Sequence, residues 1–152
     1  MKIIFDHQIF THQKFGGISR YIVNLSNHIN KGNKIESKIF APFHTNIHLR
    51  KFDNSKRLYI PTKYNFFKKK MSFINQKLFE IYIKNNKPDI HHATYYDYNF
   101  KNENIPKVLT VYDLIHEKFS NNKLPKLNSI KSSDHIICIS NNTKEDLIKY
   151  YN

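Results

Sequence analysis

The first part of the chain alternates between a strand pattern and a helix pattern, and this alternation constrains the fold more than any other feature. The apolar run Lys2–Asp6 has the length and composition of a strand. After it come apolar residues spaced as on one face of a helix, namely Ile18, Ile22, Leu25 and Ile29. Gly32 is expected to end that helix, and Ile35–Ala41, which stops at Pro42, predicts a second strand. Together these segments predict a βαβ unit.

A second long helix is predicted further along the chain. Residues 42–57 are polar and aperiodic, so we expect a loop there, followed by a brief strand over Leu58–Ile60. The helix is expected to end near Lys84, before a break at Asn85–Pro88. Its predicted inner face comprises Phe67, Met71, Ile74, Leu78 and Ile81.

The last part of the chain continues the alternation. Strands are predicted from Ile90, over Lys107–Val111 and over His135–Ile139. A final helix follows, with a capping box of Asn142 and Glu145 and an inner face of Leu147, Ile148 and Tyr151. Strands that alternate with helices predict one α/β domain over residues 1–152, with a single Rossmann-like, doubly wound and mostly parallel sheet.

Two of the three glycines, Gly16 and Gly17, lie between the first predicted strand and the first predicted helix. Glycine at this point lets backbone N–H groups approach a ligand at the positive end of the helix dipole, where a phosphate is stabilised. Glycines also occur where a strand simply turns into a helix, and neither G-x-G-x-x-G nor G-x-x-x-x-G-K-[ST] is present. The pair by itself therefore leaves a phosphate site and a plain turn as alternatives.

Composition indicates a soluble globular domain, with 39% hydrophobic and 24% charged residues. No apolar run approaches the roughly 20 residues that a membrane-spanning helix needs, and Met1 leads directly into the first strand pattern. We therefore expect a cytoplasmic protein. The single cysteine, Cys138, lies in an apolar run, and we expect it to be buried in a strand.

The formal net charge of +13 is compatible with binding to nucleic acid or to anionic membrane. Lysines outnumber arginines by 22 to 3, whereas base readout and bidentate phosphate contacts depend on arginine. We therefore expect no specific nucleic-acid partner, and solvated lysines explain the charge. A non-catalytic basic module that binds anionic membrane or polymer stays open as an alternative function.

The run FFKKK, residues 66–70, combines two phenylalanines with three lysines at the start of the long predicted helix. Such a segment can dock on an anionic bilayer, as interfacial helices do. We favour an ordinary crossover helix with a solvated lysine turn, because the apolar stripe is no wider than core packing requires. Peripheral contact with the inner face of a membrane is the second expectation.

Ligands of parallel sheets bind beyond the carboxyl ends of the strands, so the residues that follow each strand form the candidate site. No metal is expected, because the adjacent His91 and His92 would point to opposite faces of a strand and no H-E-x-x-H pattern occurs; no hydrolase elbow G-x-S-x-G occurs either. These residues are better suited to positioning a substrate. They are Asp6 and His7; His91, His92, Thr94, Tyr95 and Tyr96; Tyr112, Asp113, His116 and Glu117; and Ser140, Asn141 and Asn142.

Four blocks carry a resemblance to a known family: FGGISRYIVNL (15–25), DIHHATYY (89–96), LTVYDLIHE (109–117) and SDHIICISNNTKEDLIKYY (133–151). In this order, over nearly the whole chain, they resemble the N-terminal domain of family 4 retaining glycosyltransferases, which have two facing Rossmann domains (the GT-B fold). The resemblance implies transfer of a sugar from a nucleotide-sugar donor to a saccharide or lipid-linked acceptor, in cell-surface polysaccharide synthesis. We expect no cofactor.

The resemblance assigns binding roles on both sides of a cleft. Gly16 and Gly17 match the family's glycine loop beside the donor diphosphate, and Arg20 matches a basic position on the first helix. On the acceptor side, the matching loop residues are His91, His92 and Tyr95.

The resemblance also implies catalytic candidates. Tyr112 stands where many members have a histidine that contacts the transferred sugar. His116, in a matching His-Glu pair, is expected to supply an imidazole instead, and Asp113 is close enough in sequence to pair with it. Ser140 matches the serine that ends the last strand before the crossing to the second domain.

In this family the C-terminal domain holds the nucleotide and most of the donor sugar, and residues 1–152 contain no counterpart of it. Sugar transfer needs both substrates desolvated and aligned in a closed cleft, with positive groups on the leaving diphosphate. We therefore expect the chain to be inactive, or nearly so, without a second domain or chain. A truncated product, one half of a split enzyme and a remnant are all compatible with the sequence.

Overall fold

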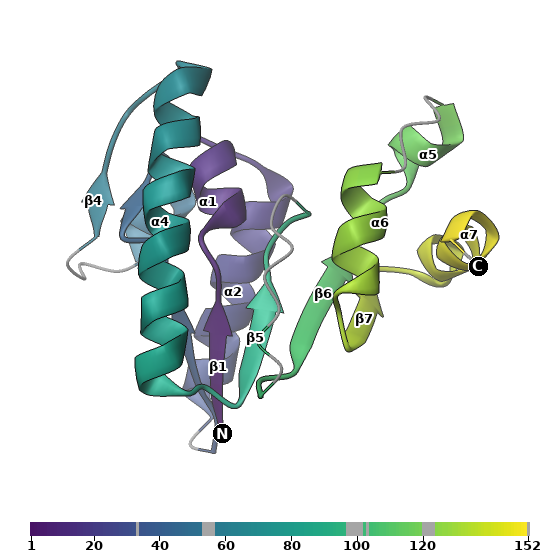
Figure 1. Ribbon diagram of the computed structural model, residues 1–152, viewed down its shortest axis with the longest axis horizontal. Helices are drawn as coiled ribbons and strands as arrows, with labels where there is room; N and C mark the ends of the chain where they lie inside the picture. The colour runs from purple at the N-terminus through teal and green to yellow at the C-terminus, as the bar shows by residue number, and fades with distance from the viewer. Residues whose placement is uncertain (33, 53–56, 97–101, 103, 120–123, 152) are drawn as a thin grey trace.

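The computed structural model describes residues 1–32, 34–52, 57–96, 102, 104–119 and 124–151 (Figure 1). Its centre is a five-stranded parallel sheet of order β2-β1-β5-β6-β7. The strands are β1 (Lys2–Phe5), β2 (Glu36–Ile39), β5 (Ile90–Ala93), β6 (Lys107–Val111) and β7 (His135–Cys138). The predicted α/β class with a parallel, Rossmann-like sheet is confirmed.

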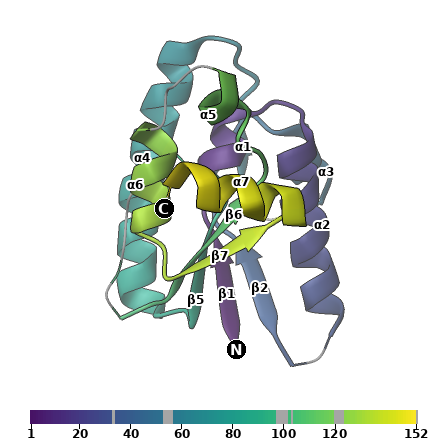
Figure 2. The ribbon, with the colours of Figure 1, turned by 90° about the vertical axis from the view of Figure 1, so that its right-hand side faces the viewer.

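Helices cover both faces of the sheet (Figure 2). One face carries α2 (Gly17–Lys31) and α3 (Ile47–Phe52), and the other carries α4 (Asn65–Asn86) and α6 (Leu124–Lys131). Shorter helices α1 (Gln8–His12) and α5 (Ile115–Phe119) follow β1 and β6, and α7 (Asn141–Tyr151) follows β7. A second, two-stranded parallel sheet is formed by β3 (Phe43–His44) and β4 (Leu58–Tyr59).

The core follows from the alternation of side chains along β1, since successive residues of a strand face opposite sides of the sheet. Ile4 packs with Phe79 and Ile83 of α4. Phe5 faces the other way and packs with Ile22 and Val23 of α2. The first βαβ unit therefore has an apolar layer on each side of the sheet.

Several short elements lie where a loop was predicted or no element was expected. Residues 42–57 contain β3 and α3 in their described part, and α1 lies between the first strand and the glycine pair. The α1 residues from Gln8 to Thr11 are all buried, and a helix buried on every side shows no amphipathic period.

The predicted inner face of the long helix is wrong in register. Of its five residues only Met71 is buried, whereas Phe67, Ile74, Leu78 and Ile81 are exposed. The face that packs on the sheet comprises Met71, Asn75, Phe79 and Ile83. The other apolar residues of α4 therefore form a second stripe, which faces away from the sheet.

The C-terminal region differs from expectation in three respects. The cap of α7 is Ser140, whose Oγ accepts from Thr143 N at 3.1 Å, and not Asn142. Ile148 is exposed, while Leu147 and Tyr151 pack on the core as predicted. Cys138 is only partly buried, because β7 is the edge strand of the sheet.

The register of α4 makes a direct prediction about stability. Ile83→Ala is expected to lower the free energy of unfolding by about 2–5 kcal/mol, because Ile83 is fully buried between α4 and the sheet. Ile81→Ala is the matched control, and it should cost less than about 0.5 kcal/mol because Ile81 is 57% exposed. Urea denaturation measures both, and similar losses for the two variants would contradict the observed register.

Candidate functional site

The sheet has one topological switch point, between β1 and β5. The chain passes from β1 to β2 on one side, whereas β5, β6 and β7 follow on the other side. In open parallel sheets the ligand crevice forms at this point, outside the carboxyl ends of the strands. The residues after β1 and β5 are therefore at the centre of the candidate site.

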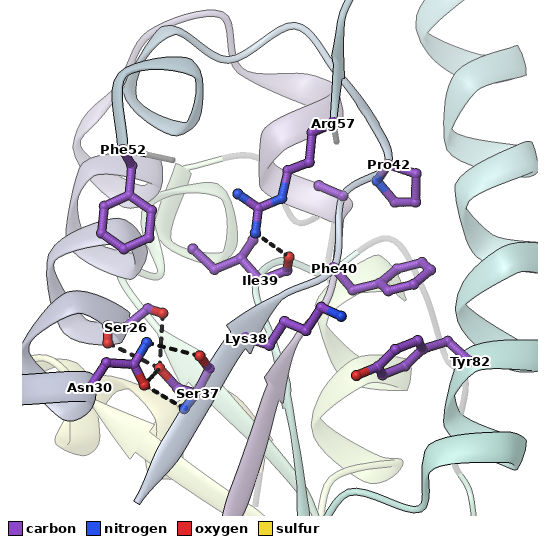
Figure 3. A pocket seen from close by; sticks show the side chains of 11 residues that line it. Ser26, Asn30, Ser37, Lys38, Ile39, Phe40, Pro42, Phe52, Arg57 and Tyr82 are labelled. Atoms are coloured by element: carbon purple, nitrogen blue, oxygen red, sulfur yellow. Dashed lines mark hydrogen bonds between the residues drawn. The ribbon is translucent and has the colours of Figure 1, made fainter. Parts of the chain in front are cut away.

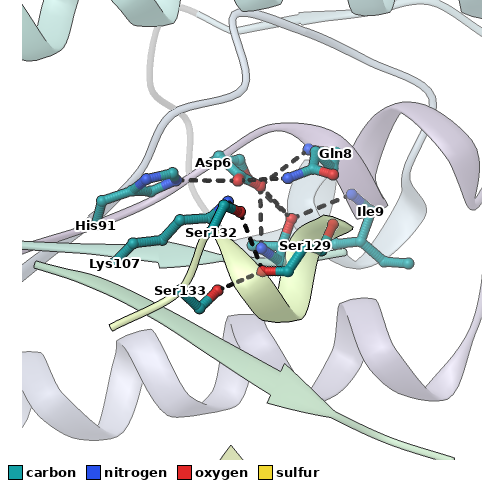
Figure 4. Close-up of polar contacts among 9 residues, drawn as sticks. Asp6, Gln8, Ile9, His91, Lys107, Ser129, Ser132 and Ser133 are labelled. Atoms are coloured by element: carbon teal, nitrogen blue, oxygen red, sulfur yellow. Dashed lines mark hydrogen bonds and ion pairs between the residues drawn. The ribbon is translucent and has the colours of Figure 1, made fainter. Parts of the chain in front are cut away.

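The Asp6 carboxylate occupies the switch point and is fully buried (Figure 4). Its Oδ1 accepts hydrogen bonds from Thr94 Oγ1 at 2.6 Å and from Thr94 N at 3.1 Å. Its Oδ2 accepts from Gln8 Nε2 at 2.7 Å and lies 3.1 Å from His91 Nε2. The carboxylate thus joins the end of β1, the start of α1 and the end of β5.

Burial alone would raise the pKa of Asp6. The hydrogen bond and charge of His91, the charge of His7 and the Thr94 hydroxyl act the other way and hold the pKa well below its usual range. Asp6 is therefore ionised at neutral pH, and its bonds are committed within the protein. Its role here is to position the loops that surround the site.

The two adjacent histidines point to opposite faces of the sheet, and both are buried. The His91 ring packs on Phe79 of α4, with ring centres 4.9 Å apart. His92 packs on Phe5 at 4.9 Å, and its Nε2 lies 2.8 Å from Thr110 Oγ1. Neither imidazole reaches solvent in this conformation, so contact between them and an acceptor stays a prediction.

Aromatic side chains close the site between β5 and β6. Tyr96 OH accepts a hydrogen bond from Tyr112 N at 3.0 Å, and burial raises the pKa of both phenols. The Tyr112 ring meets Tyr21 of α2 edge-on, with centres 6.0 Å apart. Tyr95 is only partly buried and lies against the His12 ring at 6.0 Å. Tyr95 is therefore the predicted acceptor residue that the structure leaves accessible.

The glycine pair is at the N-terminus of α2, where Gly16 is the N-cap and no side chain caps the helix. Arg20 N donates to Gly16 O at 3.2 Å, so the three preceding amides have no intrahelical acceptor. Apart from its chain neighbours and the backbone of its own helix, no described atom lies within 4 Å of the point where a Cβ of residue 17 would stand, whereas a Cβ at Gly16 would clash with the Gln13 side chain. Gly17 thus faces open space.

The first turn of α2 is close to the strand ends. Ile18 packs against the cluster that contains Ala93 and Tyr112, so the glycine pair lies beside the ends of β5 and β6. Arg20 is exposed, and its guanidinium has no hydrogen-bond partner among the residues that the structure describes. The three predicted donor residues are therefore brought together.

Of the predicted catalytic residues, Asp113 and His116 are exposed and Tyr112 is buried. The Asp113 Oδ1 atom accepts from Ile115 N at 3.3 Å and lies 3.5 Å from Lys126 Nζ. His116 is on α5, which follows the β6 loop. All three stand at the carboxyl end of β6, which is where the sequence placed them.

Sequence reasoning missed a buried network behind these residues. Lys126 Nζ lies 3.0 Å from Glu117 Oε2 and donates to Asp113 O at 2.8 Å. Tyr151 OH donates to Glu117 Oε1 at 2.7 Å. The network joins α5, α6 and α7, and the separations of 9 and 34 residues match no motif that could have signalled it.

The surface around the site is apolar and open. Large apolar side chains beside the glycine loop, on α5 and after β7 are exposed, namely Phe15, Ile115, Phe119 and Ile139. A cavity of about 430 Å³ exists elsewhere, beside the edge strand β2, and its lining includes Asn30, Arg57 and Tyr82 (Figure 3). That cavity is not lined by the residues that follow β1 and β5, so we do not assign the candidate site to it.

Two features of the described residues bear on cofactors and membranes. No group of three histidine, cysteine or acidic side chains there has an arrangement that could hold a metal ion. No helix in the same part of the chain has the length and apolar character to cross a membrane.

A five-stranded parallel sheet with helices on both faces defines a Rossmann-like α/β domain. The sequence profile of Glycosyltransferase Family 4 matches residues 15–152, and the chain belongs to that family. The resemblance carried by the four sequence blocks is thereby confirmed, and it supports a glycosyltransferase-like function. No curated protein and no solved structure matches the chain significantly.

The Asp6 network predicts a large effect of a single substitution. Asp6→Ala is expected to lower the free energy of unfolding by about 3–5 kcal/mol, because it removes the buried partner of His91 and Thr94. Asp89→Ala is the control, since among the described residues its exposed carboxylate accepts only from Lys2 N, and about 1 kcal/mol is expected. Equal losses of unfolding free energy in urea denaturation would show that the Asp6 network contributes no more to stability than an exposed hydrogen bond does.

The buried histidines predict a loss of stability in mild acid. Burial lowers the pKa of His7 and of His92 to about 4, although the charge of Asp6 opposes this shift. Between pH 6.5 and 4 the unfolded chain therefore binds more protons than the folded one, so stability falls as the pH falls. The expected loss is about 2 kcal/mol per histidine between pH 7 and pH 5.

This pH dependence is measured by urea denaturation at a series of pH values. His92→Asn should make the dependence shallower, whereas His28→Asn on the exposed side of α2 should leave it unchanged. A midpoint that is constant between pH 7 and pH 5 would refute the assignment of neutral, buried imidazoles.

Proposed function

We propose that this chain is the acceptor-side domain of a retaining glycosyltransferase, which transfers a sugar from a nucleotide-sugar donor to a saccharide or lipid-linked acceptor. The observation that carries the proposal is the open N-terminus of α2, with Gly17 facing free space beside the switch point. Family membership supports the reaction class. Synthesis of cell-surface polysaccharide is the setting in which such a transfer is expected.

The donor diphosphate is expected at the glycine pair. The first three amides of α2 and the helix dipole favour an anion, and Arg20 adds a full positive charge one turn along the helix. A side chain at residue 17 would occupy space that is open in the structure, which is where a diphosphate would approach the backbone. Of the two alternatives for the glycine pair, the arrangement therefore favours a phosphate site over a plain turn.

The acceptor is expected beside Tyr95, at the end of β5. Its partly exposed ring, which lies at a tilt beside His12, offers a flat surface of the kind on which sugars pack. His91 and His92 would position the acceptor site without touching the acceptor, since both hold β5 in place through buried contacts. Asp113 and His116 stand at the next strand end and are candidates for contact with the transferred sugar.

The reaction needs a second domain or chain that closes the site. The apolar side chains Phe15, Ile115 and Phe119 are exposed around the site, which suits a surface that another domain or chain covers. One open wall cannot exclude water from the reacting groups or hold the leaving diphosphate. We therefore expect little or no transfer by residues 1–152 alone.

The glycine loop predicts that binding and stability respond differently to one substitution. Gly17→Ala is expected to leave stability unchanged or to raise it by up to about 1 kcal/mol, because residue 17 is helical and nothing lies near its Cβ position. The same change should weaken binding of UDP, or of GDP, at the amides of residues 17–19. Binding to one wall is expected to be weak, with a Kd of about 1 mM or higher.

Titration of the ¹⁵N-labelled protein with UDP and with GDP, followed by NMR amide shifts, measures this effect. Gly32→Ala, at the other end of α2, is the matched control and should bind as the unchanged protein does. If neither nucleotide shifts the amides of residues 17–19, or if Gly17→Ala binds equally well, the proposed donor site is wrong.

A further inference from the structure

Helix α4 has a second apolar stripe, which faces away from the sheet and is exposed. We call this stripe the outward face; it comprises Phe66, Phe67, Phe73, Ile74, Leu78 and Ile81. Phe66 is 68% exposed and Phe73 is 62% exposed. Figures 1 and 2 show α4 as the outermost element on its side of the sheet, with no described segment over it. Isolated apolar side chains are common on protein surfaces, but six large ones on one side of a helix form a patch that calls for an explanation.

Lysines lie within and beside the outward face. At 100° per residue, Lys70, Lys77 and Lys84 share the same side of the helix as Phe66 and Phe73. Lys70 Nζ lies 5.5 Å from the centre of the Phe66 ring. Helix α4 contains five lysines and one acidic residue, Glu80, which pairs with Lys77 at 3.1 Å. The outward face is therefore both apolar and strongly basic.

A basic pocket adjoins the N-terminal end of this face. It has a volume of about 430 Å³, and Lys14, Lys63 and Lys68 line it together with Thr62 and Tyr64. Lys68 Nζ donates to His12 O at 3.0 Å, which holds that lysine at the pocket wall. None of the described residues that line the pocket is acidic. Its chemistry suits a phosphate group.

We infer that the outward face of α4 binds the surface of an anionic phospholipid membrane, with the helix lying flat in the headgroup region. The apolar side chains would enter the boundary between headgroups and acyl chains, as interfacial helices do. The lysines would extend along the helix surface to lipid phosphates, and the basic pocket would take one headgroup. The helix, about 33 Å long, offers a continuous contact.

A second copy of the chain is a poorer occupant of this surface. Two outward faces packed together would bring Lys70, Lys77 and Lys84 of both copies into a desolvated interface. Only Glu80 could offset that charge, and it is already paired with Lys77. Buried like charges are costly, whereas a bilayer supplies negative phosphates at the same depth as the lysines.

Membrane binding at α4 would place the candidate site near the bilayer. The helix starts at the carboxyl edge of the sheet (Figure 1). The glycine pair at the start of α2 and Tyr95, two residues after β5, belong to the same edge. A lipid-linked acceptor could then reach the site without leaving the membrane. The membrane inference itself does not rest on the proposed sugar transfer, because the outward face and the basic pocket carry it alone.

Co-sedimentation with vesicles of phosphatidylcholine, with and without one third of phosphatidylglycerol, tests the inference. The protein should partition strongly only onto the anionic vesicles, and added salt should weaken the binding. Phe66→Ser/Phe73→Ser/Ile81→Ser should lower the partition coefficient at least about tenfold. Lys70→Gln/Lys77→Gln should lower it about fivefold per lysine. All five residues are on the surface of the helix, and thermal melts will check that the variants fold.

Two controls make the result decisive. Ile148→Ser/Lys149→Gln on α7 makes the same kinds of change at exposed positions on another helix and should leave binding intact. Because the chain has no tryptophan, Phe73→Trp gives a single reporter whose emission should shift to the blue on anionic vesicles. Ile148→Trp should show no such shift.

Three outcomes would overturn the inference. Binding that survives the triple apolar substitution would mean that the overall charge of +13 attracts vesicles without insertion of α4. A protein that forms a dimer in light scattering, loses it with the triple substitution and ignores vesicles would have a protein interface at this face. Equal partitioning onto neutral vesicles would remove the role of the lysines.

Discussion

The buried Asp6 carboxylate determines how the two halves of the sheet meet. Within the part of the chain that the structure describes, polar contacts reach it from Gln8 of α1, from His91 of β5 and from Thr94 directly after β5. An unpaired carboxylate in this position would be very unfavourable, so β1, α1 and β5 can take only arrangements that satisfy it. The crevice at the switch point is consequently filled by protein groups. A ligand must therefore bind further out, between the N-terminus of α2 and the loops that follow β5 and β6.

The parallel sheet was predictable because β-branched runs and helical stripes alternate along the chain, and the glycine pair marked the start of α2. The register of α4 was not. Its buried face contains Asn75, whose amide is satisfied by Phe43 N, Phe43 O and Thr11 Oγ1. The outward stripe is the more apolar of the two, so hydrophobic periodicity selected the wrong side. A polar residue with partners on other elements has no signature in a single sequence.

In the candidate site, too, the sequence predicts which residues lie near a strand end but not which of them are buried. Sequence position correctly brings His91, His92 and Tyr95 to the end of β5, but it cannot tell which side chains are buried. His91 turns toward Asp6 and α4, while Tyr95 stays partly exposed, because only tertiary packing distinguishes them. The ion pair of Glu117 and Lys126 was equally inaccessible. Each residue by itself resembles an ordinary charged residue on the surface of a short helix.

The two edge strands of the sheet, β2 and β7, differ in their side-chain contacts and in their exposure to solvent. At the β2 edge, the Asn30 amide bonds both Ser37 N and Ser37 O, which occupies groups that a foreign strand would need. At the β7 edge, Ile136 and Ile137 are exposed on opposite faces of the strand. The β7 edge, beside which α7 lies, adjoins the apolar surface around the candidate site, whereas α4 lies on another side of the molecule (Figures 1 and 2). A second domain at the site and a membrane at α4 would therefore not compete for the same surface.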